Sequence, residues 1–139
     1  MTEQEYDIHK AALVIIEDRK VILTRSKGKT VYVNPGGKLE PGESSIDAAI
    51  REAKEELTID ISKEDLELIG TFYAIAAGSE SNRLKMDVWR LNSYRGTISP
   101  SNEIAEIKRV NTDIPKGLEI GSIFLHDILP RLKSEDLID

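Results

Sequence analysis

Three glutamates near the middle of the chain, Glu52, Glu55 and Glu56, have the spacing of neighbours on one side of a helix. Like charges this close destabilise a helix unless a positive charge lies among them. Carboxylate oxygens are hard ligands that suit Mg²⁺ or Mn²⁺, so these side chains are candidate metal ligands. Arg51 lies one turn before Glu55 and can hold a carboxylate by a bidentate hydrogen bond. A solvated acidic surface with an ordinary Arg–Glu pair is the competing interpretation.

A helix expected over residues 44–57 must position these glutamates. Its apolar residues recur at three- and four-residue steps, which predicts one buried stripe made of Ile46, Ala49, Ile50, Ala53 and Leu57. Ser44 or Ser45 is the expected N-cap. A glycine-rich loop at residues 36–43 leads into the helix.

Loop and helix together resemble the motif of Nudix hydrolases, in which glycine, glutamate, Arg-Glu, Glu-Glu and an aliphatic residue stand at fixed spacings. The matching positions are Gly37, Glu43, Arg51, Glu52, Glu55, Glu56 and Ile59. Ala53 replaces a bulkier aliphatic residue, and Thr58 replaces the glycine that ends the helix. Because a β-branched residue adopts positive φ only with difficulty, we expect the helix exit to differ from the family's shape.

The resemblance implies hydrolysis of a pyrophosphate bond in a nucleoside diphosphate linked to a further group X. It implies Mg²⁺ as the cofactor, with Mn²⁺ able to substitute. Glu52 and Glu56 are then the first metal ligands, and the Gly37 carbonyl is another. Glu55 is a further ligand or the base that orients water.

Residues around these ligands also receive roles from the resemblance. Glu43 and Arg51 would brace the ligands from behind. Many Nudix enzymes carry their general base on a loop outside the motif, and Glu103, with Glu106 behind it, lies in a suitable loop before a strand. An ordinary surface glutamate is the competing interpretation of Glu103.

The substrate is indicated less sharply. Residues 34–38 resemble the Nudix enzymes that remove modified nucleoside triphosphates, so Asn34 and Lys38 are candidate substrate-binding residues. The Asn34 amide can read a base edge. ADP-ribose or nucleotide-sugar hydrolysis is the alternative, although no proline follows the motif between Thr58 and Ser99, where ADP-ribose enzymes often carry one. A non-catalytic nucleotide sensor is a third alternative, but such a protein would be expected to lose motif carboxylates.

Other side chains that could do chemistry have weaker signals. Arg25, Lys27 and Lys29 could clamp a phosphate, but we favour a solvated turn. Trp89 could stack a nucleobase, but we favour packing. His9 and His126 stand far apart in sequence, which argues against a histidine zinc site.

Composition limits the classes of partner. The 139 residues carry a formal net charge of −6, which argues against nucleic-acid or membrane partners. The partner that the resemblance implies is a small-molecule nucleotide. The chain has no cysteine, and we find no signal peptide and no apolar run long enough to cross a bilayer. We therefore expect a cytoplasmic protein. A homodimer would fit the family, whose domains often pair.

Alternating apolar patterns predict the strands around the helix. We expect strands at residues 8–17, 21–25, 31–34 and 66–77, a hairpin loop at 78–82, a return strand around 84–88 and a last strand at 107–111. Gly70 is a candidate bulge, and a C-terminal helix spans 123–132 with a kink or restart at Pro130. This order gives an α/β fold, a mixed sheet covered by helices on both faces. The resemblance implies a single Nudix α/β/α sandwich over residues 1–139.

Overall fold

The computed structural model describes residues 6–75 and 83–139. Within them, the strands form one mixed sheet in the order β4-β5-β1-β2-β6, and β3 pairs with β1 beside this path. β1 and β5 run parallel, whereas the other paired strands are antiparallel. The strands are β1 (Ile8–Glu17), β2 (Lys20–Ser26), β3 (Gly36–Lys38), β4 (Leu66–Ile75), β5 (Arg83–Leu91) and β6 (Ile104–Val110).

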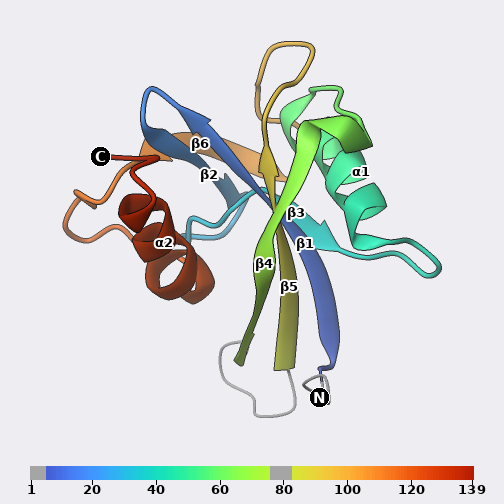
Figure 1. Cartoon of the computed structure of the whole chain (residues 1–139), viewed down its shortest axis with the longest axis horizontal. Coiled ribbons are helices and arrows are strands. Elements are labelled where there is room, and N and C mark those ends of the chain that lie inside the picture. The colour runs from blue at the N-terminus through green and yellow to red at the C-terminus, as the bar shows by residue number, and fades with distance from the viewer. Residues whose placement is uncertain (1–5, 76–82) are drawn as a thin grey trace.

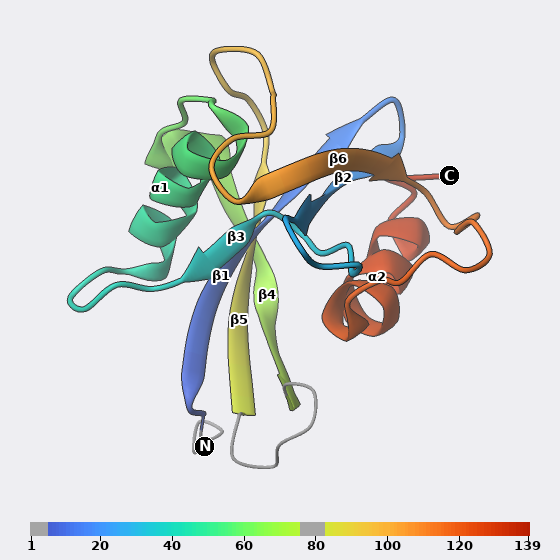
Figure 2. The same cartoon turned by 180° about the vertical axis from the view of Figure 1, so that it is seen from behind.

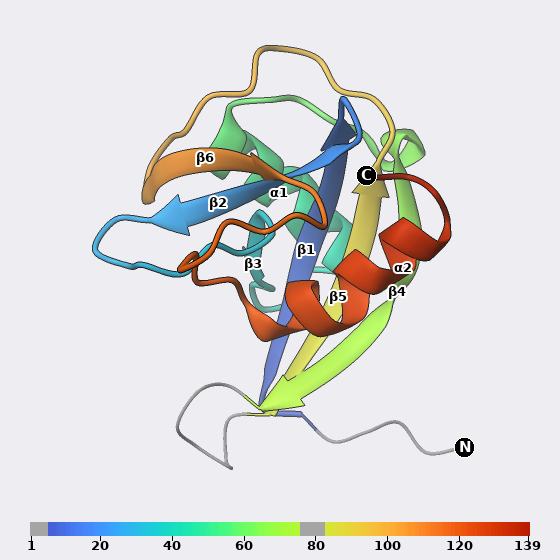
Figure 3. The ribbon, with the colours of Figure 1, turned by 90° about the vertical axis from the view of Figure 1, so that its left-hand side faces the viewer.

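Helices cover both faces of this sheet, as Figure 1 and Figure 2 show. α1 (Ser45–Leu57) lies on one face. α2 (Leu129–Ser134) lies on the other, and Figure 3 shows it in front of β5 with α1 behind the sheet. A 3-10 turn (Lys63–Asp65) precedes β4. The predicted α/β/α sandwich with a mixed sheet is confirmed.

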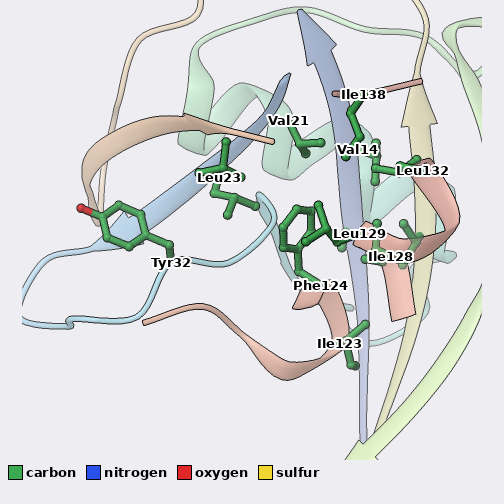
Figure 4. Packing of buried hydrophobic residues seen from close by; sticks show 13 residues of the cluster. Val14, Val21, Leu23, Tyr32, Ile123, Phe124, Ile128, Leu129, Leu132 and Ile138 are labelled. Carbon is green, nitrogen blue, oxygen red and sulfur yellow. The ribbon is translucent and has the colours of Figure 1, made fainter. Parts of the chain in front are cut away.

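β1 is the central strand because its apolar run faces two cores. Ala12 and Val14 pack into the core beneath α2, while Leu13 and Ile15 pack into the core beneath α1. Figure 4 shows the first of these cores, where Phe124 and Leu132 pack near Val14. The expected strand with two buried faces is therefore confirmed.

α1 begins as predicted, because the side chain of Ser44 accepts a hydrogen bond from the Asp47 N–H at 3.2 Å. Its exit corrects our expectation. Thr58 adopts the left-handed conformation with φ of 61°, and its N–H bonds to the carbonyls of Ala53 and Lys54. The Thr58 hydroxyl also lies 2.8 Å from the Ser99 hydroxyl. These contacts offset a conformational cost of about 1–2 kcal/mol, so threonine ends the helix as glycine would.

The predicted strand at residues 31–34 is wrong. That segment makes only isolated bridges, Thr24 with Val33 and Tyr32 with Ile120, and the strand that pairs with β1 is β3. β3 can pair with β1 because its Gly36 has no side chain: a Cβ there would stand 2.0 Å from the Ala11 carbonyl oxygen. Only a glycine backbone can approach β1 so closely.

Other elements differ from the prediction in their limits. β6 begins at Ile104 rather than residue 107, because its first residues pair with the end of β2. The C-terminal helix is interrupted, since a π-helical turn (Phe124–Ile128) precedes α2, and Pro130 stands in the first turn of α2. The backbone stays helical through Ile128 and Leu129, so the predicted break at Pro130 takes the form of a π-helical turn that leads directly into α2 and not of a separate restart. The register shift at Gly70 confirms the bulge, while the predicted end of β4 at 76–77 and the loop 78–82 lie outside the described residues.

A membrane-spanning helix is not found in the described ranges, where every helix is too short or too polar to cross a bilayer.

Candidate metal and active site

Three carboxylates meet at the C-terminal half of α1. Glu52, Glu56 and Glu103 each place an oxygen within 4.8 Å of the others. Glu52 and Glu56 are buried, with 7% and 4% of their surface exposed, whereas Glu103 is exposed. We call these residues the carboxylate cluster. Such a set of hard oxygen donors fits a divalent cation such as Mg²⁺ or Mn²⁺.

The loop before β6 is fixed against α1, and this brings Glu103 to the helix. The Ser101 N–H donates to the Glu56 carbonyl at 3.0 Å. Asn102 has a φ of 55°, and its side-chain amide donates to the Glu55 carbonyl at 2.9 Å. Asn102 is a positioning residue that the sequence reasoning missed, although asparagine before a strand is a signal for a left-handed residue.

Glycines on β3 line the other side of the cluster. The Gly36 N–H donates to Glu56 Oε1 at 2.8 Å. At Gly37, a Cβ would lie 2.7 Å from Glu52 Oε2, so a larger residue would displace that carboxylate. The structure thus places Gly37 against Glu52, next to the predicted ligand set.

Arg51 joins the loop to the helix. It donates to both oxygens of Glu43 at 2.9 Å, to Glu52 Oε1 at 2.6 Å and to Glu55 Oε2 at 3.1 Å. It also donates to the Lys38 carbonyl at 3.1 Å. The Arg51 hydrogen bonds lower the pKa of Glu43 to about 2, and they raise the pKa of Arg51. This geometry fits the bracing role expected of Glu43 and Arg51.

The two buried carboxylates have raised pKa values. Burial is the largest cause of the raised pKa of Glu52. Burial, followed by the charges of Glu52 and Glu103, raises the pKa of Glu56 to about 8, against the lowering effect of the Gly36 N–H. A divalent cation among these oxygens would neutralise the repulsion that both groups experience.

A stability measurement tests the electrostatics of Glu56. Because its pKa is raised from 4.5 to about 8, its contribution to stability is fully present below pH 4.5 and is lost as pH rises towards 8. In the absence of divalent cations, we expect Glu56→Gln to be more stable than wild type at pH 8, with a smaller difference near pH 4.5. Thermal unfolding with chelator at both pH values measures this. An equal difference in Tm at both would contradict it.

Other predicted residues lie outside the carboxylate cluster. Glu55 is exposed and forms an ion pair with Arg51. Glu106 faces away, because its carboxylate accepts hydrogen bonds from Arg25 and from the Tyr32 hydroxyl. Lys38 is exposed on β3.

The histidines, Trp89 and Arg25, which had weaker signals in the sequence, lie outside the carboxylate cluster. His9 lies 2.6 Å from Asp87, while His126 is exposed. Trp89 packs against the core beneath α1 and donates to the Ser45 hydroxyl at 3.2 Å, so packing is the better interpretation. Arg25 also donates to the Lys29 carbonyl, which fits a turn.

A pocket of about 420 Å³ opens on the α2 side of β1, beside Gly36 and Gly37. Its lining is mainly apolar, and Asn34 and Lys10 also contribute to it. The Asn34 amide donates to the Leu13 carbonyl at 3.2 Å, which fixes the side chain. Its Oδ1 accepts no hydrogen bond from the described part of the chain.

The loop, helix and carboxylate cluster thus have the arrangement expected of the motif. A family model described as the NUDIX domain matches residues 7–121. The chain belongs to the Nudix family. The Nudix assignment therefore covers the whole sheet and α1, and it ends before α2.

Known proteins similar to this Nudix chain agree with the assignment. An uncharacterized Nudix hydrolase of Bacillus subtilis, YvcI, is 35% identical over 91 residues, which are 65% of this chain and 58% of the relative. The chain thus spans less than two thirds of that relative's length. The E. coli ORF135 protein has a TM-score of 0.71 at 20% identity, covering 95% of this chain and 94% of that one. A MutT Nudix hydrolase from Burkholderia pseudomallei has a TM-score of 0.68 at 21% identity, covering 82% and 91%. At these identities the two structures show a shared fold.

Proposed function

We propose that this Nudix chain hydrolyses the pyrophosphate bond of a nucleoside diphosphate linked to a further group, with a nucleoside triphosphate as the leading substrate class. The observation that carries the proposal is the carboxylate cluster beside a mainly apolar pocket. The cluster suits a cation that binds phosphates, and the pocket suits a nucleoside. Gly36 and Gly37 line the pocket and also contact the cluster, so one ligand can reach both.

In this proposal Glu52 and Glu56 hold Mg²⁺, with the Gly37 carbonyl as a further donor. When bound, the cation supplies charge neutralisation at the phosphates and lowers the pKa of a water molecule. Glu103 lies on the exposed side of the cluster and takes the proton of the attacking water. The water oxygen bonds to phosphorus as the P–O bond of the anhydride breaks, and the leaving phosphate departs with its electron pair.

Charged groups behind the ligands keep this geometry. Arg51 holds Glu52 and Glu43 together, so the ligand oxygens keep their direction when the substrate arrives. Glu55 is exposed and shares the same guanidinium, and it would be a further ligand or the group that orients water. Asn34 at the wall of the pocket offers Oδ1 to a base edge.

A substrate panel tests the proposed function. We expect phosphate or pyrophosphate release from nucleoside triphosphates, canonical or oxidised, in the presence of Mg²⁺ or Mn²⁺ and none with chelator. ADP-ribose, NADH, dinucleoside polyphosphates and nucleotide sugars complete the panel. Preferred hydrolysis of ADP-ribose or a nucleotide sugar would contradict the triphosphate proposal and support the alternative substrate class. Binding of nucleotides without turnover at any metal concentration would indicate a sensor.

A further inference from the structure

Lys10 is the single charged residue among the described residues that line the pocket. It stands on β1 between Ile8 and Ala12, on the strand face that looks towards α2. Its neighbour on β5 is Met86, which packs in the same core. A half-buried lysine on an otherwise apolar strand face is unusual, because lysine is seldom buried without a partner.

The residue directly opposite Lys10 on β3 is Lys38. Directly opposed residues of an antiparallel pair place their side chains on the same face, and like charges there are destabilising. Burial and then the Lys38 charge lower the pKa of Lys10, whereas the Glu56 charge raises it. Neither lysine forms an ion pair with a carboxylate in residues 6–75 and 83–139. An anion between the two ammonium groups would remove this repulsion.

The position of Lys10 indicates which phosphate of a nucleotide could lie between the two lysines. Lys10 lines the pocket together with Gly36 and Gly37, the two glycines that contact Glu56 and Glu52 of the carboxylate cluster. A ligand with its nucleoside in the pocket and its diphosphate at the carboxylate cluster must therefore pass Lys10 at the phosphate attached to the nucleoside. A protein of net charge −6 also needs local cations to hold a phosphate chain.

We infer that Lys10, together with Lys38, binds the phosphate attached to the nucleoside. Lys10 is therefore a specificity-determining residue. This inference rests on the proposed function. Lys10 selects ligands that carry a phosphate at this point over bare nucleosides. It makes the contact in the ground state and in the transition state alike, so it contributes to binding more than to turnover.

The Lys10→Met variant tests this role, because methionine keeps an unbranched apolar stem and removes the charge. We expect KM for the best nucleotide to rise roughly 10- to 100-fold, the effect of losing a charge-assisted hydrogen bond, with kcat changed less than about threefold. Lys20→Met is the matched control, since Lys20 is exposed and stands opposite Glu17 in the β1–β2 strand pair, at the other end of β1 from Lys10. It should keep the wild-type KM. Lys10→Arg should restore part of the affinity because it restores the charge.

A binding comparison separates a phosphate contact from a structural effect. We expect the affinity for the nucleoside monophosphate to fall roughly 10- to 100-fold in Lys10→Met, while the affinity for the matching nucleoside stays unchanged. Equal weakening of both ligands, or no change in either, would overturn the inference. If Lys10→Met does not fold, Lys10→Gln serves the same comparison.

This binding comparison also keeps the two proposals apart. A wild-type protein that binds the monophosphate through Lys10 but hydrolyses no nucleotide would overturn the proposed function and support the Lys10 contact. If the wild type hydrolyses nucleotides and Lys10→Met has the same KM, the proposed function is supported and the Lys10 contact is overturned. A wild type that binds no monophosphate would overturn the Lys10 contact.

Discussion

Glu56→Gln is expected to lower kcat at saturating Mg²⁺ by roughly 100- to 1,000-fold, because it removes one ligand charge from the carboxylate cluster. Glutamine keeps the size of the side chain, and its amide can still accept the 2.8 Å hydrogen bond from Gly36. Folding should therefore be intact, and the loss of a buried negative charge should stabilise the metal-free protein.

Turnover of the best substrate, measured against Mg²⁺ concentration, checks this result. The control is Glu64→Gln, which makes the same change of charge at an exposed residue in the turn before β4. It should keep the wild-type kcat. Activity near the wild-type value in Glu56→Gln at saturating Mg²⁺ would show that Glu56 is not a ligand.

Glu103→Gln is expected to slow the chemical step by roughly 100- to 10,000-fold while leaving metal affinity close to the wild-type value, as removal of a general base should. Glu103 comes from the loop before β6 and is exposed, so the cluster can hold a cation through the two buried glutamates of α1 without it. Glu52→Gln, in contrast, should lose both metal affinity and rate. The different burial of the two carboxylates is the physical reason for the different expectation.

Mn²⁺ titration and single-turnover rates on wild type, Glu52→Gln and Glu103→Gln measure the two properties separately. If Glu103→Gln lost metal affinity as strongly as Glu52→Gln, Glu103 would be a ligand rather than the base. A wild-type rate in Glu103→Gln would place the base elsewhere, and Glu55 would be the next residue to substitute. Glu106 is a weaker candidate because its carboxylate already accepts hydrogen bonds from Arg25 and Tyr32.

Features that depend on local spacing could be predicted from the order of the residues alone. A helix has 3.6 residues per turn wherever it forms, so the positions of Glu52 and Glu56 on one side of α1, and most of its apolar stripe, follow from residue numbers alone. The stripe differs from the prediction in that Ile46 is only half-buried, whereas Ala48 is fully buried. The Ser44 cap also depends only on neighbours along the chain. The motif spacing was enough to indicate the Nudix family, which the match over residues 7–121 confirms.

Features that depend on contacts between distant segments could not be predicted in this way. Glu103 reaches Glu52 and Glu56 only because backbone and Asn102 hydrogen bonds hold its loop on α1. Thr58 keeps a left-handed conformation because Ser99, far along the chain, lies beside its hydroxyl. No local pattern contains such contacts, since they arise when the segments pack together.

Strand register is the clearest case of this limit. The opposition of Lys10 and Lys38 exists because β3 pairs with β1 through Gly36 and Gly37, and the sequence had suggested a strand at residues 31–34 instead. A shift of one residue would turn Lys38 to the other face of the sheet. The close approach of a glycine backbone to Ala11 fixes the register, and only the folded chain shows how near the two strands come.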